Sequence, residues 1–187
     1  MPFSALLNWL KRKSMEEVSI EAIKNSPRTL VARKLAKALT KQVGFKSPPV
    51  SLWKIIVHLK LESKFDVQPV EDFGENVSGI IVVIDDSTTI GFNKKQHWYR
   101  RRFTIAHEIG HFKMGSMHND LMAALTSNAP AEIEANQFAA ELLMPYQFLK
   151  ADFQSNIKSI DELSKKYCVS KEAMGWRISK SGLLTKF

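Results

Sequence analysis

The stretch RRRFTIAHEIGHFKMG, residues 100–115, places His107, Glu108 and His111 in a segment of helical character. Two histidines four residues apart lie on the same face of an α-helix, so both imidazoles can reach one ion at about 2.0–2.1 Å. Glu108 is rotated by about 100° from His107, which makes it a poor third ligand but brings it near a metal-bound water. The pattern H-E-x-x-H therefore predicts a zinc site in which Glu108 is the general base.

A catalytic zinc usually has three protein ligands and one position open to water. The downstream stretch AEIEANQFAAELLMP, residues 131–145, offers Glu132 and Glu134 on a predicted second helix. Glu132 and Asn136 lie four residues apart, so Asn136 could orient a ligand. We favour Glu132 as the third ligand, with Glu134 as the alternative. We expect one Zn²⁺ per chain, although two histidines and a carboxylate also suit iron or manganese.

The rest of the chain predicts helices, then a few short strands, then helices again, which is an α+β layout. Gly44 is a suitable end for the first helix, Ser51 caps the second, and Ser159 and Ser170 cap two short helices in the tail. Asp85, Asp86 and Ser87 predict a hairpin turn. The predicted helices are 28–43, 51–62, 103–114, 131–143 and the pair within 159–181, and the predicted strands are 64–70, 77–85 and 88–95. The residues expected to face the core from the first two helices are Leu30, Val31, Leu35, Ala38, Leu39, Val43, Trp53, Ile56, Val57 and Leu61.

The composition is that of a soluble globular protein of 187 residues, with 44% hydrophobic and 25% charged residues. We expect an N-terminal arm (1–26), one main domain (27–150) and a helical tail (151–187) packed on the same domain. There is no apolar run of 18 residues, so no membrane span is expected. The only cysteine, Cys168, excludes an intramolecular disulfide and fits a reducing, cytoplasmic setting. The net charge of +8 does not by itself choose between nucleic acid and an acidic partner.

Taken together, RRRFTIAHEIGH and the later EIEANQFAAELLMP resemble the signature of the ImmA/IrrE-type zinc metallopeptidases of bacteria and their phages. The resemblance extends over about residues 28–150. It implies a zincin-like fold, with helices packed on a small, mainly antiparallel sheet, and a zinc held by His107, His111 and Glu132, with Glu108 as the base. It also implies cleavage of a protein partner, a helix-turn-helix transcriptional repressor of a mobile element, phage or stress response. Relatives often carry a histidine where this chain has Gly115.

Three further expectations concern the cleft and the tail. TTIGFNKK, residues 88–95, is predicted to line the cleft as a sheet edge to which an extended peptide adds. The oxyanion is expected to be stabilised by His118, Tyr99 or Arg102. As an alternative function, the two tail helices have the spacing of a helix-turn-helix, which would make the chain a DNA- or repressor-binding protein that does not cut.

Overall fold

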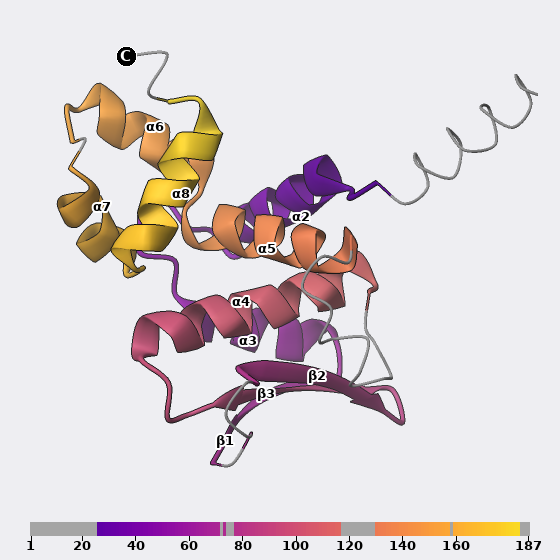
Figure 1. The fold of residues 1–187 in the computed structure, drawn as a ribbon. Helices are drawn as coiled ribbons and strands as arrows, with labels where there is room; N and C mark the ends of the chain where they lie inside the picture. Colours follow the sequence, from indigo (N-terminus) through magenta and orange to yellow (C-terminus); the bar gives the residue numbers. More distant parts are fainter. Residues whose placement is uncertain (1–25, 72, 74–76, 117–129, 158, 184–187) are drawn as a thin grey trace, which may run out of the picture.

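A computed structural model describes residues 26–71, 73, 77–116, 130–157 and 159–183 (Figure 1). Residues 1–25 of the predicted N-terminal arm and His118 lie outside these ranges. None of the helices within them is long and apolar enough to cross a membrane. The described elements are seven helices and three strands: α2 (Thr29–Gln42), α3 (Leu52–Glu62), β1 (Phe65–Val70), β2 (Gly79–Ile84), β3 (Ser87–Asn93), α4 (Trp98–Met114), α5 (Pro130–Leu143), α6 (Tyr146–Gln154), α7 (Ile160–Tyr167) and α8 (Lys171–Ser181).

The sheet has the strand order β1-β3-β2, with β1 parallel and β2 antiparallel to β3. The sheet is therefore mixed, whereas a mainly antiparallel one was expected. The predicted hairpin turn is confirmed: Asp85 and Asp86 both have positive φ, a conformation that aspartate tolerates and that suits the twist of a hairpin. Because β3 is paired on both sides, the prediction that residues 88–95 form the edge beside the cleft is wrong. Within the described part of the chain, β2 pairs only with β3.

The helices cover one face of the sheet in two layers (Figure 1). In Figure 1, α3 and α4 lie directly above the sheet, and α2 and α5 lie above α4. The fully buried Ile90 of β3, Ile109 of α4 and Phe138 of α5 belong to one hydrophobic core that runs through these layers. The layering brings α4 against the sheet on one side and against α5 on the other, which places the predicted metal ligands at the centre of the fold.

The first two helices form as predicted, and Leu39 and Ile56 are buried as expected, but the other buried residues differ in part. In α2 the buried residues are Ala32, Ala36, Leu39 and Thr40, whereas Leu30 and Val31 are exposed. In α3 the buried residues are Leu52, Ile55, Ile56 and Leu59, whereas Trp53, Val57 and Leu61 are exposed. The reason in α2 is that the helix packs closely on α5 through small side chains, a contact that a ranking by hydrophobicity does not reveal.

The tail packs on the same core. Leu163, Tyr167 and Met174 are fully buried members of it. The predicted caps are confirmed, because Ser159 Oγ accepts from Glu162 N and Ser170 Oγ from Ala173 N. The helix α6 was not predicted, since Pro145 was interpreted only as the end of the preceding helix.

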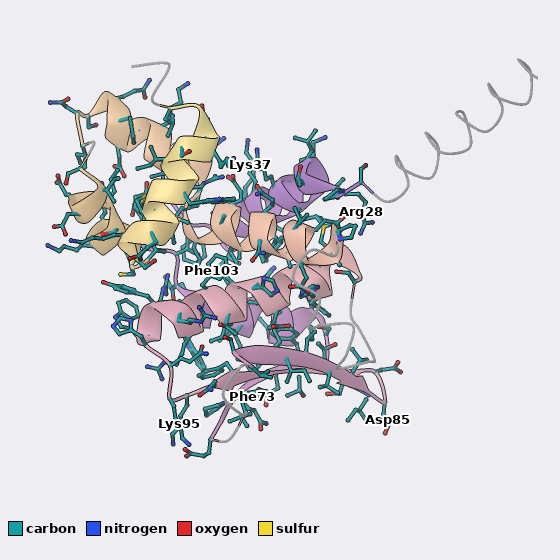
Figure 2. The ribbon with its side chains drawn as sticks, in the orientation of Figure 1. Arg28, Lys37, Phe73, Asp85, Lys95 and Phe103 are labelled. Atoms are coloured by element: carbon teal, nitrogen blue, oxygen red, sulfur yellow. The ribbon has the colours of Figure 1, made fainter. Side chains whose placement is uncertain are left out.

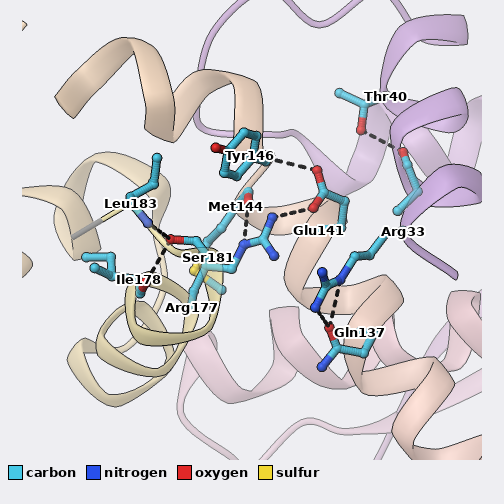
Figure 3. A network of polar contacts seen from close by, with 11 residues as sticks. Arg33, Thr40, Gln137, Glu141, Met144, Tyr146, Arg177, Ile178, Ser181 and Leu183 are labelled. Carbon is cyan, nitrogen blue, oxygen red and sulfur yellow. Dashed lines mark hydrogen bonds and ion pairs between the residues drawn. The ribbon is translucent and has the colours of Figure 1, made fainter. Parts of the chain in front are cut away.

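A buried ion pair fixes α8 to the end of α5 (Figure 3). The guanidinium of Arg177 pairs with the Glu141 carboxylate and donates from Nε to Met144 O at 3.1 Å. The other oxygen of Glu141 accepts from Tyr146 N at 3.0 Å. Each polar group in this apolar region thus has a partner, which is the condition for burying such a pair without a large cost.

Candidate metal centre

Helices α4 and α5 approach closely enough for their side chains to share one ion. A Cβ added at Gly110 would lie 3.0 Å from Ala135 Cα, so only glycine fits there without a shift. The helix α4 begins at Trp98, about one turn earlier than predicted, because the His97 side chain caps it by accepting from Tyr99 N. It ends at Gly115, whose φ of 67° is the left-handed cap conformation. A histidine at this position would be strained.

The structure brings His107, His111 and Glu132 together. The Nε2 atoms of His107 and His111 are 3.0 Å apart. Glu132 Oε2 lies 3.1 Å from His107 Nε2, and Glu132 Oε1 lies 3.0 Å from His111 Nε2. All three residues thus direct one possible ligand atom to a common point.

The other nitrogen of each imidazole is held by a neighbour. His107 Nδ1 donates to Asn136 Oδ1 at 3.0 Å, the amide oxygen being an acceptor. In a neutral His107, Nε2 is then the atom with the lone pair. His111 Nδ1 shares a hydrogen bond of 3.2 Å with Ser116 Oγ. This pattern, with one nitrogen anchored and the other free to bind, is that of metal-ligating histidines.

The donor set fits a zinc ion. Ligands at about 2.1 Å around a tetrahedral zinc are about 3.4 Å from one another. The two imidazole Nε2 atoms are 3.0 Å apart, and each has a different Glu132 oxygen near it, Oε2 at 3.1 Å from His107 and Oε1 at 3.0 Å from His111. Two neutral imidazoles that face each other with lone pairs at such a distance repel unless a proton or a cation lies between them. Two nitrogens and one carboxylate oxygen are also the donor types that zinc accepts.

Glu108 lies beside this group without joining it. Its carboxylate is buried, and burial raises the pKa of Glu108, although the nearby His107 and His111 partly oppose the shift. An added Cβ at Gly79 would lie 3.2 Å from Glu108 Oε1, so the start of β2 passes directly over the carboxylate. A carboxyl group whose pKa is raised above its ordinary value is suited to taking up and returning a proton near neutral pH.

The pKa values of His107 and Glu132 reflect the contacts between them. Burial alone would raise the pKa of Glu132, but its hydrogen bonds to His107 and His111 outweigh burial and hold the pKa at about 2. For His107, burial acts to lower the pKa, but the carboxylates of Glu132 and Glu108 and the bond to Asn136 raise it overall. Without a cation, His107 therefore holds a proton more readily than an ordinary histidine does.

Glu134, the alternative ligand, is paired instead with Arg28, which lies just before α2 (Figure 2). Its Oε1 accepts from Arg28 N at 2.7 Å and from Arg28 Nε at 2.9 Å, and its Oε2 accepts from Arg28 NH2 at 2.8 Å. Arg33 similarly donates to Gln137 at 2.7 and 3.0 Å. These contacts join α2 to the face of α5 that points away from the histidines, and they fix the rotation of α5 that directs Glu132 towards α4.

A pocket of about 940 Å³ opens beside the histidines and extends well past them. Its lining includes Tyr99, one of the three oxyanion candidates. Arg102 does not line it, because its guanidinium donates to Cys168 O at 3.1 Å and to Val50 O at 3.0 Å. The expectation that Arg102 could stabilise an oxyanion is therefore wrong. The Arg102 side chain instead ties α4 to the tail and to the segment before α3.

Several lining residues were not anticipated. The pocket is bordered by Val77 to Ile80 at the start of β2 and by Ala173 and Trp176 of α8. Ser116, the partner of His111, also escaped prediction. Two glycines in the sequence could have indicated these residues. Gly79 marks a strand that must approach a helix closely, and Gly115 turns the chain back so that Ser116 reaches His111.

Comparisons with known proteins bear on the family and the fold. The family model described as "IrrE N-terminal-like domain", a peptidase family, matches residues 62–179. A comparison with curated protein sequences gives no match. Among solved structures, a Mycobacterium tuberculosis transcriptional regulator is similar, with a TM-score of 0.60 and 19% identity over 79% of this chain and 46% of that one. At this identity the likeness shows the fold alone, and this chain spans less than half the length of that protein.

Proposed function

This chain belongs to the peptidase family of the IrrE N-terminal-like domain, and from that premise we propose that it is a zinc-dependent endopeptidase acting on a partner protein. The observation that carries the proposal is the convergence of His107, His111 and Glu132 within 4.8 Å, with the buried Glu108 beside them and an open pocket in front. A bound zinc ion would supply Lewis acidity, polarising the scissile carbonyl and making a water molecule acidic at neutral pH.

Glu108 performs the proton transfers. Its carboxylate accepts a proton from the attacking water and donates it to the leaving amine, and its raised pKa suits both steps. Asn136 and Ser116 hold the two imidazoles in orientation through their Nδ1 atoms. Tyr99 lines the same pocket and is the remaining described candidate for stabilising the oxyanion.

The substrate binds as an extended strand against β2. Asn93 N donates to Ser78 O, and backbone hydrogen-bonded pairs alternate along an antiparallel ladder. In the observed register, the even-numbered residues of β2 are therefore the ones whose backbone groups bond to β3. The N–H and C=O groups of Gly79, Ile81 and Val83 then point away from β3. Gly79 lies next to Glu108. A peptide paired with this edge thus presents its backbone to the catalytic group.

We further propose that the natural substrate is a helix-turn-helix transcriptional repressor, which places the activity in the cytoplasm. This step rests on the resemblance of the two sequence motifs to peptidases that cleave such repressors. The alternative is a protein that binds DNA or a repressor without cutting it. The tail offers less to that alternative because Ala173 and Trp176 of α8 face the pocket and Met174, Arg177 and Ile178 are buried.

The decisive experiment compares wild type with Glu108→Gln on a helix-turn-helix repressor, sought first among the genes that neighbour the one for this protein. We expect zinc-loaded wild type to cleave it, a chelator to stop cleavage, and Glu108→Gln to lower kcat/KM about 10²–10⁴-fold at unchanged zinc content. Glu162→Gln, at an exposed position on α7, is the matched control and should cleave normally. Cleavage by Glu108→Gln at the wild-type rate would refute the assigned base. Repressor binding without cleavage by zinc-loaded wild type would favour the alternative.

A further inference from the structure

The pocket continues along α4 and α5 beyond the presumed zinc ligands. Phe103 lies one helical turn before His107, with 6.4 Å between the ring centroids, on the side of α4 towards α5 (Figure 2). Ala140 follows Asn136 by one turn of α5, and Met144 comes directly after the end of that helix. Since α4 and α5 pack together, these side chains extend the pocket away from the histidines and replace polar lining by apolar lining.

The tail closes this extension. Val169, Ala173 and Trp176 line the same pocket. Val169 and Met144 are almost fully buried, whereas Trp176 is 43% exposed, so its indole contacts both the pocket and solvent. The charged lining residues Arg100 and Glu172 are exposed and therefore remain solvated. The neighbouring Arg177 is anchored to Glu141 and Met144 (Figure 3), which holds this part of α8 against the end of α5.

Building on the proposed peptidase function, we infer that this extension is an apolar subsite. It accepts a large apolar side chain, leucine, methionine or phenylalanine, from the substrate residue next to the scissile bond. Its walls are Phe103, Ala140, Met144, Val169, Ala173 and Trp176.

Two observations favour this occupant. Residues of an extended peptide are about 3.3 Å apart, so a side chain next to the reacting carbonyl reaches a ring centred 6.4 Å from that of His107. The six wall residues carry no charge, so a small or polar side chain would leave apolar surface in contact with water. The tail is then part of the substrate site, and α8 sets the specificity.

Binding to the subsite can be measured without any cleavage. The zinc-loaded protein is titrated with N-acetyl-leucine amide, N-acetyl-phenylalanine amide and N-acetyl-alanine amide. The indole N–H resonance of Trp176, identified by its loss in Trp176→Phe, is followed by NMR. We expect it to shift with the leucine and phenylalanine compounds at millimolar concentration and not with the alanine compound. The indole of Trp53, which is 70% exposed on α3, should not move. No shift up to about 50 mM, or an equal shift of Trp53, overturns the inference.

Cleavage provides the second measurement. Mass spectrometry of a mixture of defined peptides should show leucine, methionine or phenylalanine enriched on one side of the cut. Trp176→Ala should lower the preference for leucine over alanine there by about tenfold or more, and Trp53→Ala should preserve it. An unchanged preference in Trp176→Ala contradicts the subsite. Glu108→Gln separates the two proposals. If this variant still cuts the substrate, the proposed mechanism is refuted and the subsite is not. If it no longer cuts, but the Trp176 resonance does not shift in the NMR titration, the subsite alone is refuted.

Discussion

At the scale of single residues, zinc binding depends on whether the His107 imidazole is protonated. A metal binds only the neutral imidazole, and the neighbouring carboxylates raise the pKa of His107 above 6.5 against the opposing effect of burial. Protons therefore compete with zinc up to a higher pH than at an ordinary histidine. We expect zinc affinity, measured by competition with a chromophoric chelator, to weaken progressively as the pH falls from 8 to 5.5. His58→Gln, outside the site, should show the same profile. An affinity that is flat over this range would contradict the assignment of His107 as a ligand.

Asn136 holds His107 from behind, and its removal should weaken the site without unfolding the helix. Asn136→Ala removes the acceptor of the Nδ1 hydrogen bond. Loss of such a partner typically lowers metal affinity about 10–100-fold, and we expect a change of that size in zinc titrations. Asn136→Asp retains an acceptor oxygen and should stay near wild type. Equal loss in both variants would show that the side chain acts by packing and not by accepting the hydrogen bond.

At the scale of elements, Gly79 determines how closely β2 can lie to α4. A Cβ at this position would be 2.3 Å from Thr104 Cγ2 and 3.2 Å from Glu108 Oε1. Gly79→Ala therefore forces the strand and helix apart, and overpacking of this kind costs about 1–3 kcal/mol of unfolding free energy. Urea denaturation measures that loss, and kcat/KM should fall as well because Glu108 is displaced.

The matched double variant tests the cause. Thr104→Ser removes the Cγ2 that the new methyl group would overlap, so Gly79→Ala/Thr104→Ser should recover most of both losses. If the double variant is no better than Gly79→Ala, the contact with Thr104 does not set the spacing of these two elements.

The elements also show what the sequence could and could not predict. The helix carrying His107 and His111 follows from local spacing, and so does the turn at Asp85, because both patterns are contained within a few residues. The central position of β3 depends on a parallel pairing with β1, which lies far along the chain, so no local pattern predicts it. The buried face of α2 depends on close packing of alanines against α5, where side-chain size matters more than hydrophobicity.

The residues of the candidate site also differ in how far the sequence alone could predict them. Glu132 and Glu134 are both acidic residues in the first turns of α5, and their sequence positions do not distinguish them. What separates them is Arg28, about a hundred residues earlier, which holds Glu134 on the opposite side of the helix. Trp176 could not be assigned from sequence, because its place in the pocket depends on how the tail folds back over α5.

At the scale of the whole molecule, the metal should be a structural link as well as a catalytic one. Its ligands come from α4 and α5, the two helices that connect the sheet with α2 and the tail. An ion that binds only the folded state at a thousand times its Kd adds about 4 kcal/mol of stability. For a chain of this size each kcal/mol corresponds to about 2–4 °C in Tm, so saturation with zinc should raise Tm by roughly 8–16 °C.

Differential scanning calorimetry of zinc-loaded and chelator-treated protein measures this shift. His111→Gln removes one ligand and should melt at nearly the same temperature with and without zinc. Glu108→Gln should keep the full shift, since Glu108 is not among the ligands. This contrast separates a side chain that stabilises the fold through an ion from one that acts only on the substrate. If Glu108→Gln lost the shift and His111→Gln kept it, the two roles would have to be reassigned, because binding by all three ligands is what makes the helices melt together.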